Sequence, residues 1–399
     1  MNMKTSTTLS RLSESATIAM ARMARELKSD GKDVISLSLG EPDFNTPDFI
    51  KEAAKKAIEQ NYSHYTPVNG YLEVREAVCT KFKRDNDLDY TPDQIVLSTG
   101  AKQSIGNIVF ALVSPGEKVL LPAPFWVSYS EVIKMAGGIP VSIETHIDND
   151  FKITAQQLEE AIAIHNPVMM IFSSPCNPSG SVYSYDELKS ISNVIRKFPE
   201  FYVISDEIYE HIIFEGTNYS LAKFPEIYNQ IITVNGVSKA FAMTGWRLGY
   251  IGAPTWIAKA AAKIQGQLTS APSSISQMAA KKALETDPSE IEFMRIEFLR
   301  RRDLMLGWLK EIKGMKLNVP EGAFYIFPNI EYFLGKSYQG KKINDASDLC
   351  MHLLKEFNVA LVTGDAFGAP NCIRISYASS KDNLQKAAAR IKEGLESLK

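Results

Sequence analysis

The segment Val237–Tyr250 contains a lysine whose surroundings are unlike those of a surface lysine. Lys239 stands among small and apolar residues, and Arg247 follows it eight positions later. An amine that is withdrawn from water loses part of its preference for the charged form and becomes available as a nucleophile. The segment therefore predicts a desolvated, reactive amine at Lys239.

Other side chains that could do chemistry follow short apolar runs in the middle of the chain. Asp206 comes directly after the run 201–205, Tyr209 follows it closely, and Asn177 lies between two prolines after another run. Taken alone, Asp206 could be a helix N-cap and Asn177 part of a rigid turn. A partly buried carboxylate at Asp206 would need a cationic partner, because an unpaired buried charge is very costly.

Two further runs end in features that suit a flat ligand with an anionic group. Gly100, Ala101 and Lys102 follow QIVLST and open a helical segment, whose free N–H groups would point at an anion. Trp126 follows EKVLLPAPF and could be a packing residue or a surface for a ring. Together the candidates comprise a phosphate cradle, a flat ring, an amide, a carboxylate, a phenol, an amine and a guanidinium. A pyridoxal phosphate site needs that inventory.

The elements that must position these residues are strands of an α/β sheet. Apolar runs that end in Gly, Pro, Ser or Asn alternate with helical segments, and the runs are QIVLSTG, EKVLLPAP, PVMMIFSSP, FYVISDE, QIITVNG and RLGYIGAP. This alternation predicts parallel strands with helices on both faces of the sheet. Ligands of such sheets bind at the carboxyl ends of the strands, which is where the candidate residues stand.

A second, smaller α+β domain is predicted at the end of the chain. After about Pro288 the pattern changes to a long charged helix, shorter strands within AFYIFPN, VALVTG and CIRISYA, and a final amphipathic helix at about 382–398. The N-terminal segment through VISLSLGEPDF is too short to stand alone, so we expect it to pack with this domain. The predicted division is a large domain over 48–288 and a small domain formed by 1–47 and 289–399.

Length and composition exclude several classes of protein. The 399 residues suit two or three domains, and 44 Lys and Arg against 46 Asp and Glu give a net charge of −2. This balance disfavours a nucleic-acid-binding or polybasic membrane-surface protein. Four scattered cysteines without a CxxC pair favour a reducing compartment, and the N-terminus has no apolar signal region. We therefore expect a cytoplasmic protein with neither nucleic acid nor membrane as a partner.

The order and spacing of the candidate residues resemble those of the fold-type I pyridoxal-phosphate aminotransferases of class I and II, most of all the bacterial Iβ aspartate aminotransferases. The resemblance covers nearly the whole chain, and SKAFAMTGWRLGY at 238–250 is its most specific element. It implies a large α/β domain with a mostly parallel seven-stranded sheet flanked by helices, plus a smaller α+β domain. It also implies pyridoxal 5′-phosphate as the cofactor and a homodimer as the assembly.

The resemblance assigns cofactor roles residue by residue. Lys239 matches the lysine that bonds covalently to the cofactor and, once released, carries a proton between the substrate Cα and the cofactor. Asp206 matches the partner of the pyridine nitrogen, and Asp206, Tyr209 and Lys239 are the predicted catalytic residues. The other matched cofactor contacts are the donors to the 3′-oxygen, Asn177 and Tyr209, the stacked ring of Trp126, the phosphate site of Gly100, Ala101, Lys102, Ser238 and Arg247, and Tyr65, which reaches the phosphate of the neighbouring subunit.

The resemblance also assigns substrate contacts. Arg374 matches the arginine that holds the α-carboxylate through two parallel hydrogen bonds, a geometry that lysine cannot reproduce. Gly40 matches the glycine whose backbone approaches the same carboxylate. The remaining predicted contacts are Trp126 and Asn177, and the group that reads a distal carboxylate, Lys102, Ser15 and Thr17. These matches imply reversible amino transfer from L-aspartate to 2-oxoglutarate, giving oxaloacetate and L-glutamate.

Two positions depart from the family pattern. Gly236 stands where many relatives carry a phosphate-binding serine, so that contact is missing or comes from Ser238 or water. Ser13 stands where members that accept prephenate tend to carry Lys or Arg, although Arg11 is close by. Ser13 therefore gives no support for prephenate activity, and an aspartate/prephenate or aromatic amino acid aminotransferase is the alternative function.

Other functional classes lack their characteristic patterns. No GxGxxG follows a predicted strand, which disfavours a nucleotide-binding oxidoreductase. A non-catalytic regulator built on the same body would usually carry an added DNA-binding domain, and the length leaves no room for one. We predict no metal site, because no paired metal spacing links the histidines His64, His146, His165, His211 and His352.

Overall fold

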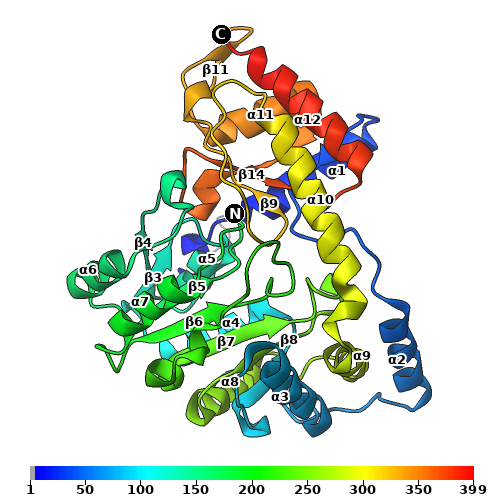
Figure 1. Cartoon of the computed structure of the whole chain (residues 1–399), viewed down its shortest axis with the longest axis vertical. Helices are drawn as coiled ribbons and strands as arrows, with labels where there is room; N and C mark the ends of the chain where they lie inside the picture. The colour runs from blue at the N-terminus through cyan, green and yellow to red at the C-terminus, as the bar shows by residue number, and fades with distance from the viewer. Residues whose placement is uncertain (1–4) are drawn as a thin grey trace.

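The computed structural model describes residues 5–399, and a seven-stranded sheet forms the centre of its larger part (Figure 1). The strand order is β2-β8-β7-β6-β5-β3-β4. Strand β8 runs antiparallel to β2 and β7, and the other neighbouring pairs are parallel, which confirms the mostly parallel sheet. The strands are β2 (Ile95–Ser98), β3 (Lys118–Pro122), β4 (Ile139–Ile143), β5 (Met169–Ser173), β6 (Tyr202–Asp206), β7 (Ile231–Gly236) and β8 (Gly249–Gly252).

Strand β4 is the one member of this sheet that is absent from the predicted apolar runs. It lies at the edge of the sheet and pairs with β3 alone. Ile139 is exposed and Ile143 is buried, so the strand is covered only in part. The continuous apolar pattern used for the prediction belongs to strands that are buried on both faces, and an edge strand does not need it.

Helices cover both faces of the sheet, as the α/β pattern predicts. On one face α4 (Ala101–Leu112), α5 (Ser128–Met135) and α8 (Thr255–Leu268) share a buried apolar core with the strands. The core of the other face is built with α3 (Leu72–Asn86), α6 (Ala155–His165), α7 (Tyr185–Ile195), α9 (Ser274–Glu285) and α2 (Asp48–Glu59), which packs on α9.

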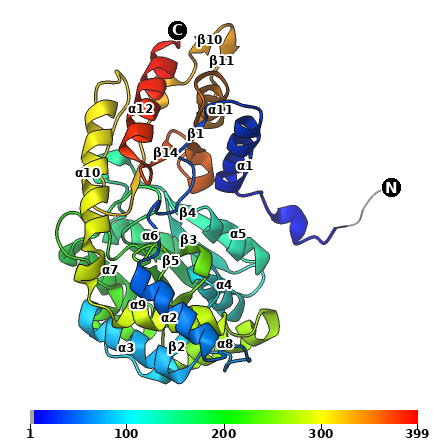
Figure 2. The same ribbon diagram turned by 90° about the vertical axis from the view of Figure 1, so that its right-hand side faces the viewer.

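A second α+β part combines helix α1 and strand β1 with the C-terminal elements of the chain. Its helices are α1 (Ala16–Ser29), α10 (Glu292–Leu309), α11 (Ala346–Phe357) and α12 (Lys381–Glu396). The N-terminal β1 (Ile35–Ser36) pairs in parallel with β12 (Val359–Ala360), so the N-terminal segment packs with the C-terminal part as expected (Figure 2). The remaining strands are β9 (Tyr325–Ile326), β13 (Val362–Thr363) and β14 (Ile373–Ser376), in the order β13-β14-β9, and the hairpin of β10 (Ser337–Tyr338) and β11 (Lys341–Lys342).

This packing supports the division of the chain near residues 48 and 288, which we keep as a proposal. Side chains of α2 join the core of the large sheet, whereas those of α1 and β1 join the core of the smaller part. Helix α10 runs from one part to the other (Figure 1), and its buried Met294 packs with the large core. Residues 1–4, assigned to the small domain, lie outside the described residues.

Two further sequence expectations concern compartment and membrane. The cysteines Cys79, Cys176, Cys350 and Cys372 are all free thiols. Within residues 5–399, no helix combines the length and the apolar character that crossing a membrane would need.

Candidate active site

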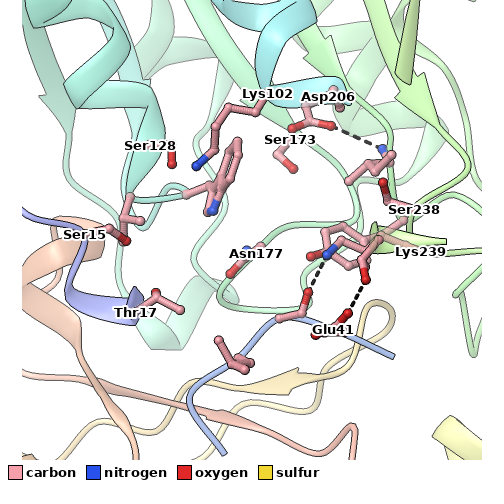
Figure 3. A pocket seen from close by; sticks show the side chains of 18 of the residues that line it. Ser15, Thr17, Glu41, Lys102, Ser128, Ser173, Asn177, Asp206, Ser238 and Lys239 are labelled. Atoms are coloured by element: carbon pink, nitrogen blue, oxygen red, sulfur yellow. Dashed lines mark hydrogen bonds between the residues drawn. The ribbon is translucent and has the colours of Figure 1, made fainter. Parts of the chain in front are cut away.

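A cavity of about 460 Å³ lies where the central strands of the large sheet end. Its wall is formed by residues that follow β2, β3, β5, β6 and β7, by Leu39–Glu41 and by Arg374 of β14. Figure 3 shows the side chains that converge on it, with Ser15, Thr17, Ser128 and Lys102 on one side and Asp206, Ser173, Ser238 and Lys239 on the other. Every predicted site residue except Gly100 and Tyr65 is part of this wall.

Asp206, the last residue of β6, is a buried carboxylate in the cavity wall. The Tyr129 hydroxyl donates to its Oδ2 at 2.6 Å, and the Ile208 amide donates to its Oδ1 at 3.3 Å. Burial raises the pKa of Asp206 to about 6, although both hydrogen bonds act in the opposite sense. Within residues 5–399, Asp206 has no ion pair with a lysine, arginine or histidine. A cationic N–H group of a ligand would supply the partner that this carboxylate needs.

The amine of Lys239 enters the same cavity from the turn after β7. Its Nζ donates to the backbone oxygen of Gly40, so the amine contacts the segment at which a substrate carboxylate is expected. Burial lowers the pKa of Lys239 to about 8, and the positive charge of Arg374 adds to this effect. A substantial fraction of the amine is therefore neutral near physiological pH, which is the form that acts as a nucleophile or base.

The turn between β2 and α4 forms an anion cradle beside Arg247. Gly100 is the N-cap of α4 with φ +83°, and the first amides of a helix have no partner within the helix. A Cβ added to Gly100 would lie 2.4 Å from Arg247 Nη2, and one added to Gly249 would lie 2.2 Å from the Ala101 nitrogen. These glycines therefore leave the backbone N–H groups and the guanidinium close together.

Gly236, which departs from the family pattern, has a packing reason to be glycine. A Cβ at this position would lie 2.9 Å from both Gly249 Cα and the Leu248 oxygen. The tight pairing of β7 with β8 therefore disfavours a serine here. Ser238, one of the alternatives considered for this contact, lines the cavity.

Arg374 is a buried guanidinium that has no acidic partner among the described residues. Its Nη1 donates to Asn177 Oδ1 at 2.9 Å, and its Nη2 donates to the Ser38 oxygen. Its Nε is buried without a hydrogen-bond partner within residues 5–399, and the group lies over the rings of Tyr325 and Phe367. A buried cation with an unused donor suits a carboxylate ligand that binds through two hydrogen bonds.

A second cation, Lys102, also lines the cavity, and in Figure 3 its amine points away from Asp206 toward Ser128 and Ser15. Its Nζ lies 4.9 Å from the centre of the Trp126 ring. Desolvation and the charge of Arg247 lower the pKa of Lys102. Ser15 and Thr17 line the cavity near it, and Thr17 Oγ1 is buried with no hydrogen-bond partner in the described part of the chain. This corner can accept a second anionic group.

Two tyrosines of the cavity, Tyr129 and Tyr325, were not predicted from the sequence. Tyr129 lies on α5, three residues after Trp126, and holds Asp206. Tyr325 of β9 shares a hydrogen bond of 2.7 Å with the hydroxyl of Tyr209. Tyr129 is the second residue of α5 and Trp126 precedes that helix, so no helical spacing links the two, and Tyr325 belongs to a two-residue strand that carries no local signal.

Tyr65 lies away from this cavity. Its side chain is 99% exposed, in a separate surface hollow with His64, Thr66 and 271–274. A single chain therefore does not use Tyr65 in its own site, and its predicted role in a neighbouring subunit stays a prediction.

The residues of the cavity fit pyridoxal phosphate. Asp206 is a buried carboxylate that lacks a cationic partner among the described residues, and a pyridinium N–H is such a partner. Lys239 offers an amine with a lowered pKa, and the Gly100 turn with Arg247 offers a phosphate cradle that a Cβ would fill. Trp126, Asn177 and Tyr209 supply a ring face and polar groups for the aromatic body of the cofactor.

Comparison with known proteins agrees with a cavity that binds pyridoxal phosphate. The family model described as "Aminotransferase class I and II" matches residues 32–391. An aspartate/prephenate aminotransferase from Cereibacter sphaeroides is 44% identical over 389 residues, which cover 97% of each chain.

Solved structures resemble the whole chain as well. An aspartate aminotransferase from Rhizobium meliloti superimposes with a TM-score of 0.95 at 40% identity and covers 100% of each chain. The aspartate aminotransferase from Thermus thermophilus with maleate has a TM-score of 0.92 at 37% identity, covering 98% of this chain and 100% of that one.

Proposed function

Because this chain belongs to the class I and II aminotransferases, we propose that it transfers the amino group of L-aspartate reversibly to 2-oxoglutarate, giving oxaloacetate and L-glutamate. The main observation in favour of a dicarboxylic substrate is the distribution of charged residues in the cavity wall. Its wall contains the cations Lys102, Lys239, Arg247 and Arg374 but only the carboxylates Glu41 and Asp206. Lys239 bonds to the cofactor and Arg247 lies at the phosphate cradle, so Arg374 and Lys102 are left as partners for two substrate carboxylates.

Pyridoxal phosphate, when bound, supplies an aldehyde that takes up the amino group and a ring that withdraws electrons from the bonds at the substrate Cα. The neutral amine of Lys239 takes the proton from the substrate Cα and delivers it to the cofactor. The carboxylate of Asp206 stabilises a proton at the pyridine nitrogen. Asn177 and Tyr209 would hydrogen-bond the 3′-oxygen of the bound cofactor, and Trp126 would offer its ring as a stacking surface.

The two ends of the substrate have separate partners in this proposal. Arg374 binds the α-carboxylate with two parallel hydrogen bonds, beside the backbone of Gly40. Lys102, with Ser15 and Thr17, binds the distal carboxylate of aspartate or glutamate. The aspartate aminotransferase from Thermus thermophilus was solved with maleate, which is also a dicarboxylate, and this supports a site for two carboxylates.

The experiment that tests this substrate is a comparison of amino donors. The purified holoenzyme receives 2-oxoglutarate with L-aspartate, L-alanine or L-phenylalanine, and the keto acid products are quantified. We expect the highest kcat/KM with aspartate. A higher kcat/KM with phenylalanine than with aspartate would indicate an aromatic aminotransferase instead.

Prephenate is the second candidate substrate, because the relative from Cereibacter sphaeroides is named for both aspartate and prephenate. In this chain the backbone N–H of Ser13 donates to Glu131 at 2.7 Å, and the neighbouring Glu14 pairs with Arg22. Position 13 therefore supplies no cation for an additional carboxylate. An assay with aspartate as donor and prephenate as acceptor distinguishes the two activities, and we expect a lower kcat/KM for prephenate than for 2-oxoglutarate.

We further infer a cytoplasmic homodimer. The free cysteines suit a reducing compartment. The fully exposed Tyr65 is available to a second copy of the chain, in which it would contact the cofactor phosphate. No nucleic acid or membrane partner is part of the proposal.

A further inference from the structure

A cluster of buried charged side chains lies outside the cavity, behind the turn that carries Asp206 and Tyr209. At its centre is Lys81 of α3, whose side chain is 2% exposed and whose amine contacts the carboxylate of Glu210. The amine also donates to Asn86 Oδ1 at 2.7 Å and lies 3.8 Å from Asp85. We name this group, with His211 and Asn235, the Lys81 cluster.

Glu210 is the member of the Lys81 cluster that receives most hydrogen bonds. Asn86 Nδ2 donates to one oxygen and Asn235 Nδ2 to the other, each at 2.7 Å, and Lys81 contacts the second oxygen as well. Burial alone would raise the pKa of Glu210, but the charge of Lys81, followed by that of His211, lowers it to about 2. Glu210 is therefore an ionised carboxylate that holds two asparagines in fixed orientations.

Through these contacts the Lys81 cluster joins both chain segments that carry the reactive groups. Glu210 directly follows Tyr209 and lies four residues after Asp206. Asn235 Oδ1 accepts a 2.7 Å hydrogen bond from the Gly236 amide, three residues before Lys239. The ring of His211 also packs edge-on against Phe241, two residues after that lysine.

A bound metal ion is not needed to explain these residues. The ligand atoms of Asp85, Glu210 and His211 lie within 4.8 Å of one another, a proximity that sequence spacing did not reveal. Lys81 contacts Glu210, and Arg84 pairs with Asp85 at 2.5 Å, so the chain itself supplies a cation for each carboxylate. Such a buried pair contributes little net stability but strongly restricts geometry.

We propose that Lys81 is a positioning residue for amino transfer, which acts through Glu210 and Asn235 to fix the Asp206–Tyr209 turn relative to the Lys239 segment. Catalytic groups must be held within about half an ångström of their working geometry. Tyr129 and Tyr325 hold the Asp206–Tyr209 turn from the cavity side, and the Lys81 cluster holds it from the opposite side through Glu210. The inference rests on the proposed aminotransferase function only for its kinetic readout.

The first test is a pH titration of the visible absorbance band of the lysine-bound cofactor, in the absence of substrate, in the wild type and Lys81→Met. Because the variant leaves Glu210 without its cation, we expect the midpoint to shift. We also expect kcat to fall about ten- to a hundredfold, with a smaller change in KM for aspartate. Adding Glu210→Gln to Lys81→Met removes the unpaired charge and should return the midpoint toward the wild-type value.

The matched control is Arg302→Met. Arg302 is another buried cation, on α10, which pairs with Glu215 and Asp303 and has no contact with the Lys81 cluster. The Arg302→Met substitution should lower the melting temperature and leave the pH midpoint of the absorbance band and kcat unchanged. If Lys81→Met does not fold, the same measurements are made on Asn86→Ala. This variant removes one hydrogen-bond donor to Glu210 but leaves the Lys81–Glu210 ion pair in place.

A wild-type midpoint and kcat in the folded Lys81→Met or Asn86→Ala variant would overturn the proposal and leave the Lys81 cluster a purely structural feature. Failure of aspartate to react with the wild type would instead refute the proposed substrate. The midpoint would remain measurable in that case, so the two failures are distinguishable.

Discussion

At Asp206 two opposing effects set the state of a single carboxylate. Burial raises its pKa to about 6, whereas the hydroxyl of Tyr129 favours the ionised form. The ionised form is the one that can stabilise a proton at the pyridine nitrogen. The phenol of Tyr129 therefore favours ionisation of Asp206, although it belongs to none of the motifs in the sequence.

We predict that Tyr129→Phe narrows the pH range of activity from the acidic side. Loss of the donor raises the pKa of Asp206, so the carboxylate becomes ionised only at higher pH. A hydrogen bond to a charged group contributes about 1.5 kcal/mol, which corresponds to a shift of about one pH unit. The pH profile of kcat/KM measures this shift, and an unchanged acidic limb would exclude Tyr129 from tuning Asp206.

We predict that Lys102→Ala separates dicarboxylic from other substrates. The variant should lose about 30-fold in kcat/KM for aspartate, equivalent to about 2 kcal/mol, because a charge partner of the distal carboxylate is removed. Alanine and phenylalanine lack that carboxylate and should be nearly unaffected. Equal losses for all three amino acids would place Lys102 at the phosphate or in a structural role.

The residues that local pattern could identify are those that follow strands of the large sheet. Asp206, Asn177 and Lys239 each stand after an apolar run, and the structure brings them to one cavity. Tyr325 and Glu41 come from the smaller part, and their places in the wall depend on how the two parts pack. Short-range sequence patterns contain no information about that packing.

At the scale of elements, prediction succeeded where burial is continuous. The central strands are buried on both faces and read as apolar runs, whereas β4 at the edge and the two-residue strands of the smaller part have no such pattern. For the N-terminal segment the prediction rests on a different argument, because a short apolar segment without a core of its own must pack on another element. Its pairing with β12 is the result.

The close pairing of β7 with β8 at Gly236 leads to a prediction about the stability of the Gly236→Ser variant. Gly236→Ser restores the residue that many relatives carry, but its Cβ would lie 2.9 Å from Gly249 Cα. We expect a loss of about 2 kcal/mol in the free energy of unfolding, as for other overpacked sites, and no gain in affinity for pyridoxal phosphate. Chemical denaturation and cofactor titration measure the two quantities. A stable variant that binds the cofactor more tightly would show that the strands can separate here.

At the scale of the whole molecule, the single chain forms a nearly complete cavity but leaves Tyr65 unused on its surface. An exposed aromatic side chain of this kind is consistent with a contact in an assembly. Sequence reasoning about one chain identifies such a residue only through resemblance, because no local pattern indicates which residues will face a second copy.

We predict a homodimer in which Tyr65→Phe weakens cofactor binding without dissociating the subunits. Removal of one hydrogen bond to the phosphate should raise the dissociation constant of pyridoxal phosphate about tenfold, since bonds to charged groups contribute about 1.5 kcal/mol. Light scattering gives the assembly, and equilibrium dialysis gives the affinity. A monomeric enzyme that retains full affinity in the variant would contradict this arrangement.

The most direct test of the proposed function is an absorption spectrum of the purified holoenzyme before and after addition of L-aspartate alone. We predict that the visible band of the lysine-bound cofactor is replaced by the near-ultraviolet band of pyridoxamine phosphate, and that Lys239→Ala has neither the covalent band nor turnover. A visible band that aspartate leaves unchanged would contradict the substrate. Absence of the band after reconstitution with pyridoxal phosphate, or near-wild-type activity of Lys239→Ala, would contradict the central role of Lys239.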